Sequence, residues 1–114
     1  MKTMTAVLFS FLLLISTVTM AENYPPTRTY EALVKSVRMP DSANGTITVK
    51  ECDKCDYETY RVTERTVYAL NGKSMRLDDF LLVIEELRLG GDHVVNVRRD
   101  LQTNTISKVF VYTQ

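Results

Sequence analysis

The sequence of 114 residues is short of the residue types that support several common functions. It has one histidine, two cysteines and no tryptophan, and its 14 basic residues balance 14 acidic ones. A tetrahedral zinc site needs four ligands, which one cysteine pair and a distant histidine do not supply. The balanced charge gives no electrostatic reason to expect nucleic acid or an anionic membrane surface as a partner.

The chain also lacks a recognisable catalytic set. His93 directly follows Asp92, but adjacent residues of a strand point to opposite faces, so this spacing does not make them an acid and base pair. No serine or cysteine nucleophile with a partnered base is apparent. We therefore expect a protein that is not an enzyme and that uses no cofactor.

Only one long apolar run occurs, and it lies at the N-terminus. Lys2 precedes an apolar stretch over residues 6–15, and Thr19 and Ala21 are the small residues that a signal peptidase requires before its cleavage point. The stretch is shorter than the ~20 residues of a spanning helix. Residues 1–21 are therefore predicted to be a signal peptide, with an uncleaved membrane anchor as the alternative. Cleavage would leave a periplasmic or secreted chain without a membrane span.

Cleavage after Ala21 leaves 93 residues, enough for one compact domain. It removes Lys2 and no acid, so the mature chain has a net charge of −1. Residues 22–27 contain two consecutive prolines and little that can pack, which indicates an extended leader. Residues 28–114 are then expected to form a single small barrel domain.

Period-two alternation and many β-branched and aromatic residues predict strands in five places. They are residues 28–38, 46–50, 57–70, 93–99 and 105–112. The third is interrupted by the polar residues Glu64 and Arg65, so we expect one long bent strand or two short ones. Asn71 and Gly72 favour a tight type I′ turn, after which residues 73–76 are expected to pair back briefly.

One helix is predicted between the third and fourth strands, because Leu77, Phe80, Ile84 and Leu87 recur at helical spacing. Five strands with a helix after the third is the order of an OB-type Greek-key barrel, whose closure removes exposed edges. The element order resembles that of small exported OB-fold domains of bacteria. The predicted fold is mainly β, an OB-like barrel of five to six strands. An SH3-like barrel or an open α+β sheet is the alternative.

Cys52 and Cys55 are predicted to close the tip of the hairpin between the second and third strands. Pairing them opposes Ile47 with Tyr60 and separates apolar from polar faces at most positions. Opposed hairpin residues lie within disulfide distance, and export leads to an oxidising compartment. A structural disulfide is therefore expected.

Two other uses of Cys52 and Cys55 stay open. A dimer that contributes two pairs, or a soft ion such as Cu(I), would provide a metal site. A redox-active dithiol is disfavoured by Glu51, Asp53 and Asp56, because nearby acids oppose thiolate formation. The alternative function is thus a metal-handling or thiol-redox protein.

A ligand-binding face is expected on the second and third strands, where OB barrels bind elongated ligands. Its candidate residues are Lys50, Tyr57, Thr59 and Arg61, joined by Arg98 and Tyr112 from the last two strands. The tyrosines are alternatively ordinary half-buried sheet residues. The compartment and charge favour an oligosaccharide, a peptide or an envelope protein over nucleic acid. The predicted function is an exported, non-enzymatic binding or accessory module.

Overall fold

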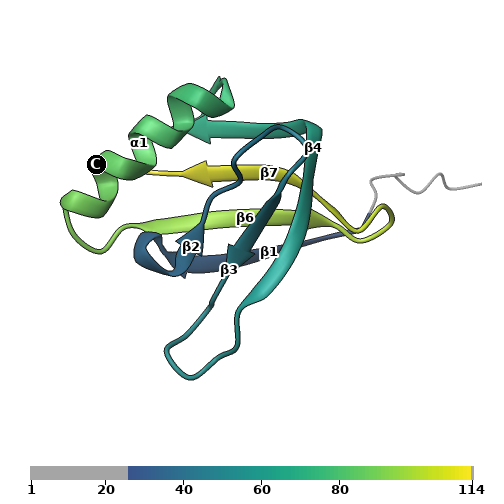
Figure 1. The fold of residues 1–114 in the computed structure, drawn as a ribbon, viewed down its shortest axis with the longest axis horizontal. Helices are drawn as coiled ribbons and strands as arrows, with labels where there is room; N and C mark the ends of the chain where they lie inside the picture. The colour runs from purple at the N-terminus through teal and green to yellow at the C-terminus, as the bar shows by residue number, and fades with distance from the viewer. Residues whose placement is uncertain (1–25, 114) are drawn as a thin grey trace, which may run out of the picture.

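The computed structural model describes residues 26–113, so the predicted signal peptide and residues 22–25 of the predicted leader lie outside the described residues. The strands are β1 (Thr27–Leu33), β2 (Val37–Arg38), β3 (Thr46–Val49), β4 (Glu58–Leu70), β5 (Lys73–Met75), β6 (Val94–Asp100) and β7 (Thr105–Val111). A 3-10 turn, η1 (Val34–Ser36), separates β1 from β2, and the helix α1 (Leu77–Leu89) follows β5 (Figure 1). Among residues 26–113 there is no helix with the length and apolar content that crossing a bilayer requires.

The strands form one sheet in the order β1-β6-β7-β4-β3-β2, with β5 paired to β4. Neighbouring strands are antiparallel, except that β4 and β7 are parallel. β1 and β2 are close in the chain but lie at opposite ends of this order. The η1 segment between them bonds to both sides: Val34 N donates to His93 O at 2.8 Å, and Lys50 N donates to Ser36 O at 3.0 Å. The sheet therefore curls into a small barrel-like fold. The predicted mainly β, OB-like architecture is confirmed.

The first predicted strand, residues 28–38, is interrupted by η1. Tyr30, Ala32 and Val34 keep a period of two and are buried, but the next buried side chain is Val37, three residues further on. A continuous strand would point Val34 and Val37 to opposite faces. The turn of η1 allows both valines to enter the core.

β4 is one long strand with a sharp bend (Figure 1). Its pairing with β7 shifts register between Val62 and Val67. At the bend, Thr66 Oγ1 donates to Ile106 O at 2.6 Å and accepts from Thr63 N at 3.0 Å. This buried hydroxyl satisfies backbone groups where the ladder is irregular. The first of the two forms predicted for this segment, one long bent strand, is confirmed.

The hairpin of β3 and β4 has the predicted register. Ile47 lies opposite Tyr60, and Val49 lies opposite Glu58. The ladder ends at this second pair, and residues 50–57 form a loop that extends away from the barrel (Figure 1).

The predicted turn after β4 is also confirmed. Asn71 has a φ of 52° and Gly72 a φ of 84°, the positive values that a tight hairpin turn needs. β5 pairs back from this turn, with Lys73 opposite Leu70. Thr113 N donates to Asn71 Oδ1 at 2.7 Å, which holds the end of the described chain beside the turn.

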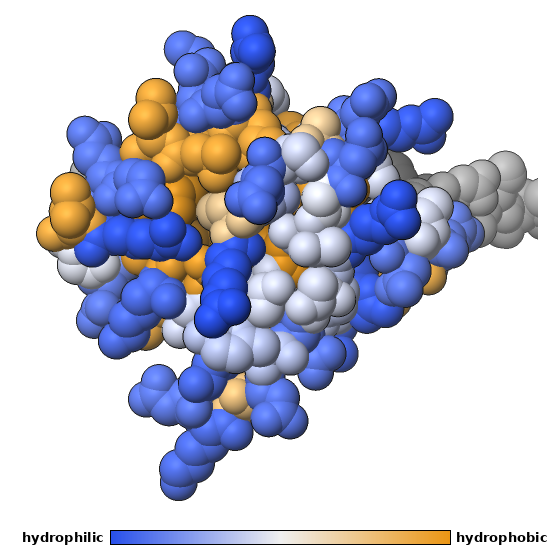
Figure 2. All heavy atoms as spheres, in the orientation of Figure 1, coloured by the Kyte–Doolittle hydropathy of each residue, from blue (hydrophilic) through white to orange (hydrophobic). Residues whose placement is uncertain are grey.

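α1 closes one end of the barrel, away from the β6–β7 turn (Figure 1). Its Phe80 and Ile84 side chains are buried, and the rings of Phe80 and Tyr68 lie 5.4 Å apart. Burying one such side chain stabilises the fold by about 1.5–3 kcal/mol. The core consists of Tyr30, Ala32, Val34, Val37, Ile47, Val49, Val62, Tyr68, Phe80, Ile84, Val95, Val97, Ile106, Val109 and Val111. Figure 2 shows further apolar side chains at the surface of the α1 end.

Arg88 ties α1 to the segment between β1 and β2. Its guanidinium donates to Val37 O at 2.6 Å and to Val34 O at 3.4 Å, and it pairs with Glu85 at 3.2 Å. The backbone carbonyls around η1 therefore gain a charged partner from the helix.

Candidate functional site

The loop of residues 50–57 carries both cysteines. A disulfide joins Cys52 and Cys55, whose Cα atoms are 5.0 Å apart, and Cys55 N donates to Cys52 O at 3.0 Å. The predicted bond at the hairpin tip is therefore present, and neither sulfur is a free thiolate in this state. Residues 26–113 contain no group of three or more histidine, cysteine or acidic side chains placed to hold a metal ion.

Four of the six predicted ligand residues lie on one outward surface, which we call the hairpin face. Its members are Arg38, Thr46, Thr48, Lys50, Tyr57, Thr59 and Arg61. Along β2 and β3 the members alternate with the buried side chains of Val37, Ile47 and Val49, and in β4 Thr59 and Arg61 flank the half-buried Tyr60. Alternate positions of a strand share one side of the sheet, so the five members that lie in strands point away from the core. Lys50 and Tyr57 lie in the adjoining loop, where Lys50 and Arg38 contact the Tyr57 ring.

Tyr57 is the exposed aromatic residue of the hairpin face. Its exposed fraction is 47%, and the Arg38 guanidinium carbon and Lys50 Nζ each lie 5.3 Å from the ring centroid. Beside it, the hydroxyl groups of Thr48 and Thr59 form a hydrogen bond of 3.0 Å. Each exposed cation and aromatic contact contributes about 0.5–1 kcal/mol. These contacts hold the ring in place without burying it.

The hairpin face carries three cations, Arg38, Lys50 and Arg61, and no acid. In the described part of the chain, ion pairs join Arg76 to Asp78 and Arg88 to Glu85, and none involves these three side chains. Glu51, Asp53, Asp56 and Glu58 lie next to this face along the chain, so its positive field is confined to the three cations. Such a local field attracts anionic groups.

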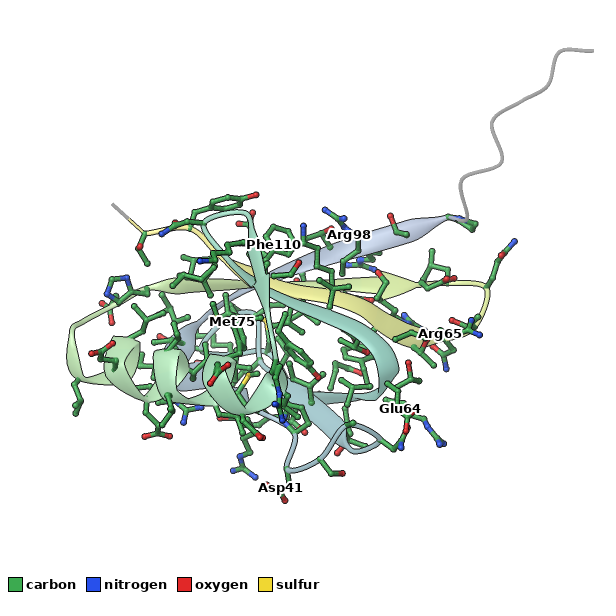
Figure 3. All side chains as sticks on the ribbon, turned by 90° about the horizontal axis from the view of Figure 1, so that it is seen from above. Asp41, Glu64, Arg65, Met75, Arg98 and Phe110 are labelled. Carbon is green, nitrogen blue, oxygen red and sulfur yellow. A yellow bond between two sulfur atoms is a disulfide. The ribbon has the colours of Figure 1, made fainter. Side chains whose placement is uncertain are left out.

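Arg98 and Tyr112 belong to a different surface. Both contact Phe110: the Arg98 guanidinium carbon lies 5.1 Å from its ring centroid, and the Tyr112 ring meets it edge-on at 5.8 Å. Figure 3 shows Arg98 and Phe110 together. The strand order separates β6 from β3 by two strands, and the curvature of the barrel turns their outward side chains in different directions. The six predicted residues thus form two groups.

Sequence reasoning missed a cluster of tyrosine and arginine residues near the β6–β7 turn. The rings of Tyr30 and Tyr60 stack at 5.1 Å. Arg99 donates to Tyr30 Oη at 3.0 Å and lies 5.1 Å from the centre of the Tyr60 ring, while Arg28 lies 4.9 Å from the Tyr30 ring. These residues come from three strands, and no local pattern in the sequence connects them.

The two stacked tyrosines titrate differently. Burial raises the pKa of Tyr30, but hydrogen bonding to Tyr60 and Arg99 and the positive charges of Arg99 and Arg28 outweigh it, so the pKa lies below its ordinary value. Burial and the hydrogen bond to Tyr30 raise the pKa of Tyr60 to about 12. Tyr60 therefore keeps its proton to a higher pH than Tyr30 does.

Two cavities lie beside the bend of β4. The first, of about 540 Å³, lies between the bend and the β6–β7 turn, and its wall includes Glu64, Arg65, Asp100 and Thr103. The second, of about 420 Å³, is called the bend cavity and is formed by the β2–β3 turn, the bend and the start of α1. The polar interruption of the third strand at Glu64 and Arg65 was a sequence signal near both cavities.

Comparisons of the chain with protein-family models, curated proteins and solved structures found no match in any of the three. The functional interpretation therefore depends on the geometry of the sites.

Proposed function

We propose that the protein is an exported, non-enzymatic binding module whose hairpin face holds an extended acidic segment of a peptide or an envelope protein. The observation that carries this proposal is the exposed ring of Tyr57, flanked at 5.3 Å by Arg38 and Lys50, two cations that form no ion pair within residues 26–113. A neutral sugar is less suited to this face. Sugars bind by stacking on an unoccupied aromatic ring, and Arg38 and Lys50 already lie close to the Tyr57 ring.

The spacing of the hairpin face suits an extended chain. A β-like peptide presents every second side chain on the same side, about 6.6 Å apart. Carboxylates at such positions would pair with Arg38 and Lys50 at one end of the face and with Arg61 at the other. The hydroxyl groups of Thr48 and Thr59 lie between them and offer hydrogen bonds to polar groups of the ligand.

The disulfide supports the same function by restraining the loop that contains Lys50 and Tyr57. Both residues lie at the ends of this loop, and the bond between Cys52 and Cys55 closes its tip. A restrained loop loses less conformational freedom on binding, so a given set of contacts yields a higher affinity.

The proposal is tested with two labelled peptides, one alternating glutamate with serine and one alternating glutamine with serine. We expect the glutamate peptide to bind and its affinity to fall as salt is added, because salt screens exposed charges. Tyr57→Ala and Arg61→Ala are expected to weaken binding about fivefold to tenfold each, the cost typical of a contributing interface residue. Arg65→Ala removes an equal charge from an exposed residue outside the hairpin face and is the matched control.

Equal binding of both peptides, or equal losses for Arg61→Ala and Arg65→Ala, would contradict the assignment of the hairpin face. Capture experiments with the exported fraction complete the test. A captured partner that survives protease treatment but is lost to glycosidases would identify an oligosaccharide instead of a peptide.

Export is proposed from the N-terminal apolar run and has its own test. The mass of the protein recovered outside the cytoplasm, measured with and without alkylation, reports cleavage after Ala21 and the state of both cysteines together. An intact N-terminus in the recovered protein would argue against a signal peptide.

A further inference from the structure

The bend cavity has a wall of mixed chemistry built from three separate segments. Asp41 and Ala43 come from the β2–β3 turn, Glu64 and Tyr68 come from β4, and Met75 lies at the end of β5. Figure 3 shows Asp41, Glu64 and Met75 around this part of the molecule, beside the start of α1. Its volume of about 420 Å³ accommodates a small organic group.

Tyr68 supplies a polar atom that nothing in the described part of the chain satisfies. Its exposed fraction is 5%, it lines the bend cavity, and its Oη has no hydrogen-bond partner among residues 26–113. Buried tyrosine hydroxyls nearly always have a partner, because removing one from water without a replacement is unfavourable. A group that enters the bend cavity and reaches Oη would provide that partner.

The charges around the cavity select a cation. Asp41, Glu64 and Asp78 line it together with a single base, Arg76. Arg76 and Asp78 pair with each other at 3.6 Å, whereas no ion pair involves Asp41 or Glu64 within the described range. The positive end of the helix dipole at the start of α1 would by itself attract an anion. The carboxylates around the cavity would repel that anion, so the cavity favours positive charge.

The apolar part of the wall narrows the choice to an organic cation. Ala43, Met75 and Leu77 provide carbon and sulfur surface beside the carboxylates. A bare metal ion gains nothing from such surface, whereas an alkyl chain with a terminal amine contacts both kinds of wall.

We propose that the bend cavity binds an alkylammonium group, which donates to Tyr68 Oη, is neutralised by Asp41 and Glu64, and packs its carbon chain against Met75. The source of the group is a lysine side chain of a peptide or a free primary amine. This site is separate from the hairpin face and does not depend on the function proposed for that face.

The direct test follows the Met75 methyl NMR signal, assigned with Met75→Leu, while n-butylamine is added to the purified protein. n-Butanol, which has the same carbon chain and no charge, is the matched probe. We expect n-butylamine to shift the Met75 signal and n-butanol to shift it much less. Met39 does not line the bend cavity and is the internal reference.

Variants test the two polar contacts. Tyr68→Phe keeps the ring that packs on Phe80 and removes only Oη, and Asp41→Asn with Glu64→Gln removes the two charges with little change of shape. Each is expected to weaken n-butylamine binding about tenfold, as the loss of a hydrogen bond to a charged group does. Glu86→Gln removes an exposed acid of α1 outside the cavity and should leave the affinity unchanged.

The outcomes separate clearly. Equal Met75 shifts with n-butylamine and n-butanol, no shift with either, or unchanged affinity in Tyr68→Phe and in the Asp41→Asn, Glu64→Gln variant would overturn the proposal. Tighter binding of an N-acetylated lysine amide than of n-butylamine would support a peptide as the source, and tighter binding of a free diamine would support a small amine. The hairpin-face variants leave these results unchanged if the two sites are independent.

Discussion

Removal of the disulfide is the perturbation whose size the structure sets most directly. Cys52 and Cys55 are separated by three positions, so the bond closes a loop of four residues. The chain-entropy relation gives about 2 kcal/mol of stabilisation for a loop this short. This value is an upper limit, because the loop lies beyond the last ladder pair, Val49 opposite Glu58, and contributes no side chain to the core. The barrel should therefore fold without the bond.

We expect the Cys52→Ser, Cys55→Ser double variant to lose no more than about 2 kcal/mol in urea unfolding at unchanged slope. For a domain of this size the melting temperature would then fall by at most about 8–16 °C. Wild-type protein measured in a reductant is the matched control and should agree with the variant. A loss of twice the expected value, or a variant that does not fold, would show that the disulfide organises the barrel and refute this reasoning.

Three further predictions concern the bend, the helix and a buried tyrosine. Thr66→Val removes a buried hydroxyl with two hydrogen bonds and should destabilise the protein by about 2–4 kcal/mol, whereas Thr48→Val at the exposed face should cost under about 1 kcal/mol in the same unfolding assay. Arg88→Met should cost about 1–3 kcal/mol because two backbone carbonyls lose a charged donor, and Arg88→Lys should restore only part of that loss; similar stability of both variants and wild type would contradict this. Burial raises the pKa of Tyr68 to about 12, so the unfolded chain ionises first, and the contribution of Tyr68 to stability should be constant below about pH 10 and decline from there to about pH 12. Tyr68→Phe should reduce this decline and remove one transition near pH 12 from the ultraviolet titration, and an unchanged titration would exclude the raised pKa.

Local patterns in the sequence specify several elements without any tertiary contact. The alternation of Ile47 and Val49 defined the inward side of the hairpin, and a shift by one residue would have exposed both. Asn71 and Gly72 tolerate positive φ and therefore specified the turn after β4. The helical spacing that includes Phe80 placed α1 correctly. Each of these signals arises from neighbouring residues and needs no knowledge of the closed barrel.

The tertiary structure alone decided which side chains meet. The break in the first strand follows from burying both Val34 and Val37, which matters only once the core exists. Curvature of the sheet separates Arg98 from the hairpin face, although the sequence prediction placed them in one ligand site.

The sequence by itself therefore determined a mainly β chain with one helix and the register of its cysteine hairpin. The bend cavity, by contrast, brings Asp41 and Tyr68 together from segments 27 positions apart, and no pattern with a period of two or 3.6 residues reports such a meeting. Strand and helix patterns reflect short-range geometry, whereas cavities and clusters depend on how the sheet bends and closes. For that reason the fold was predictable in outline, and its cavities and side-chain clusters were not.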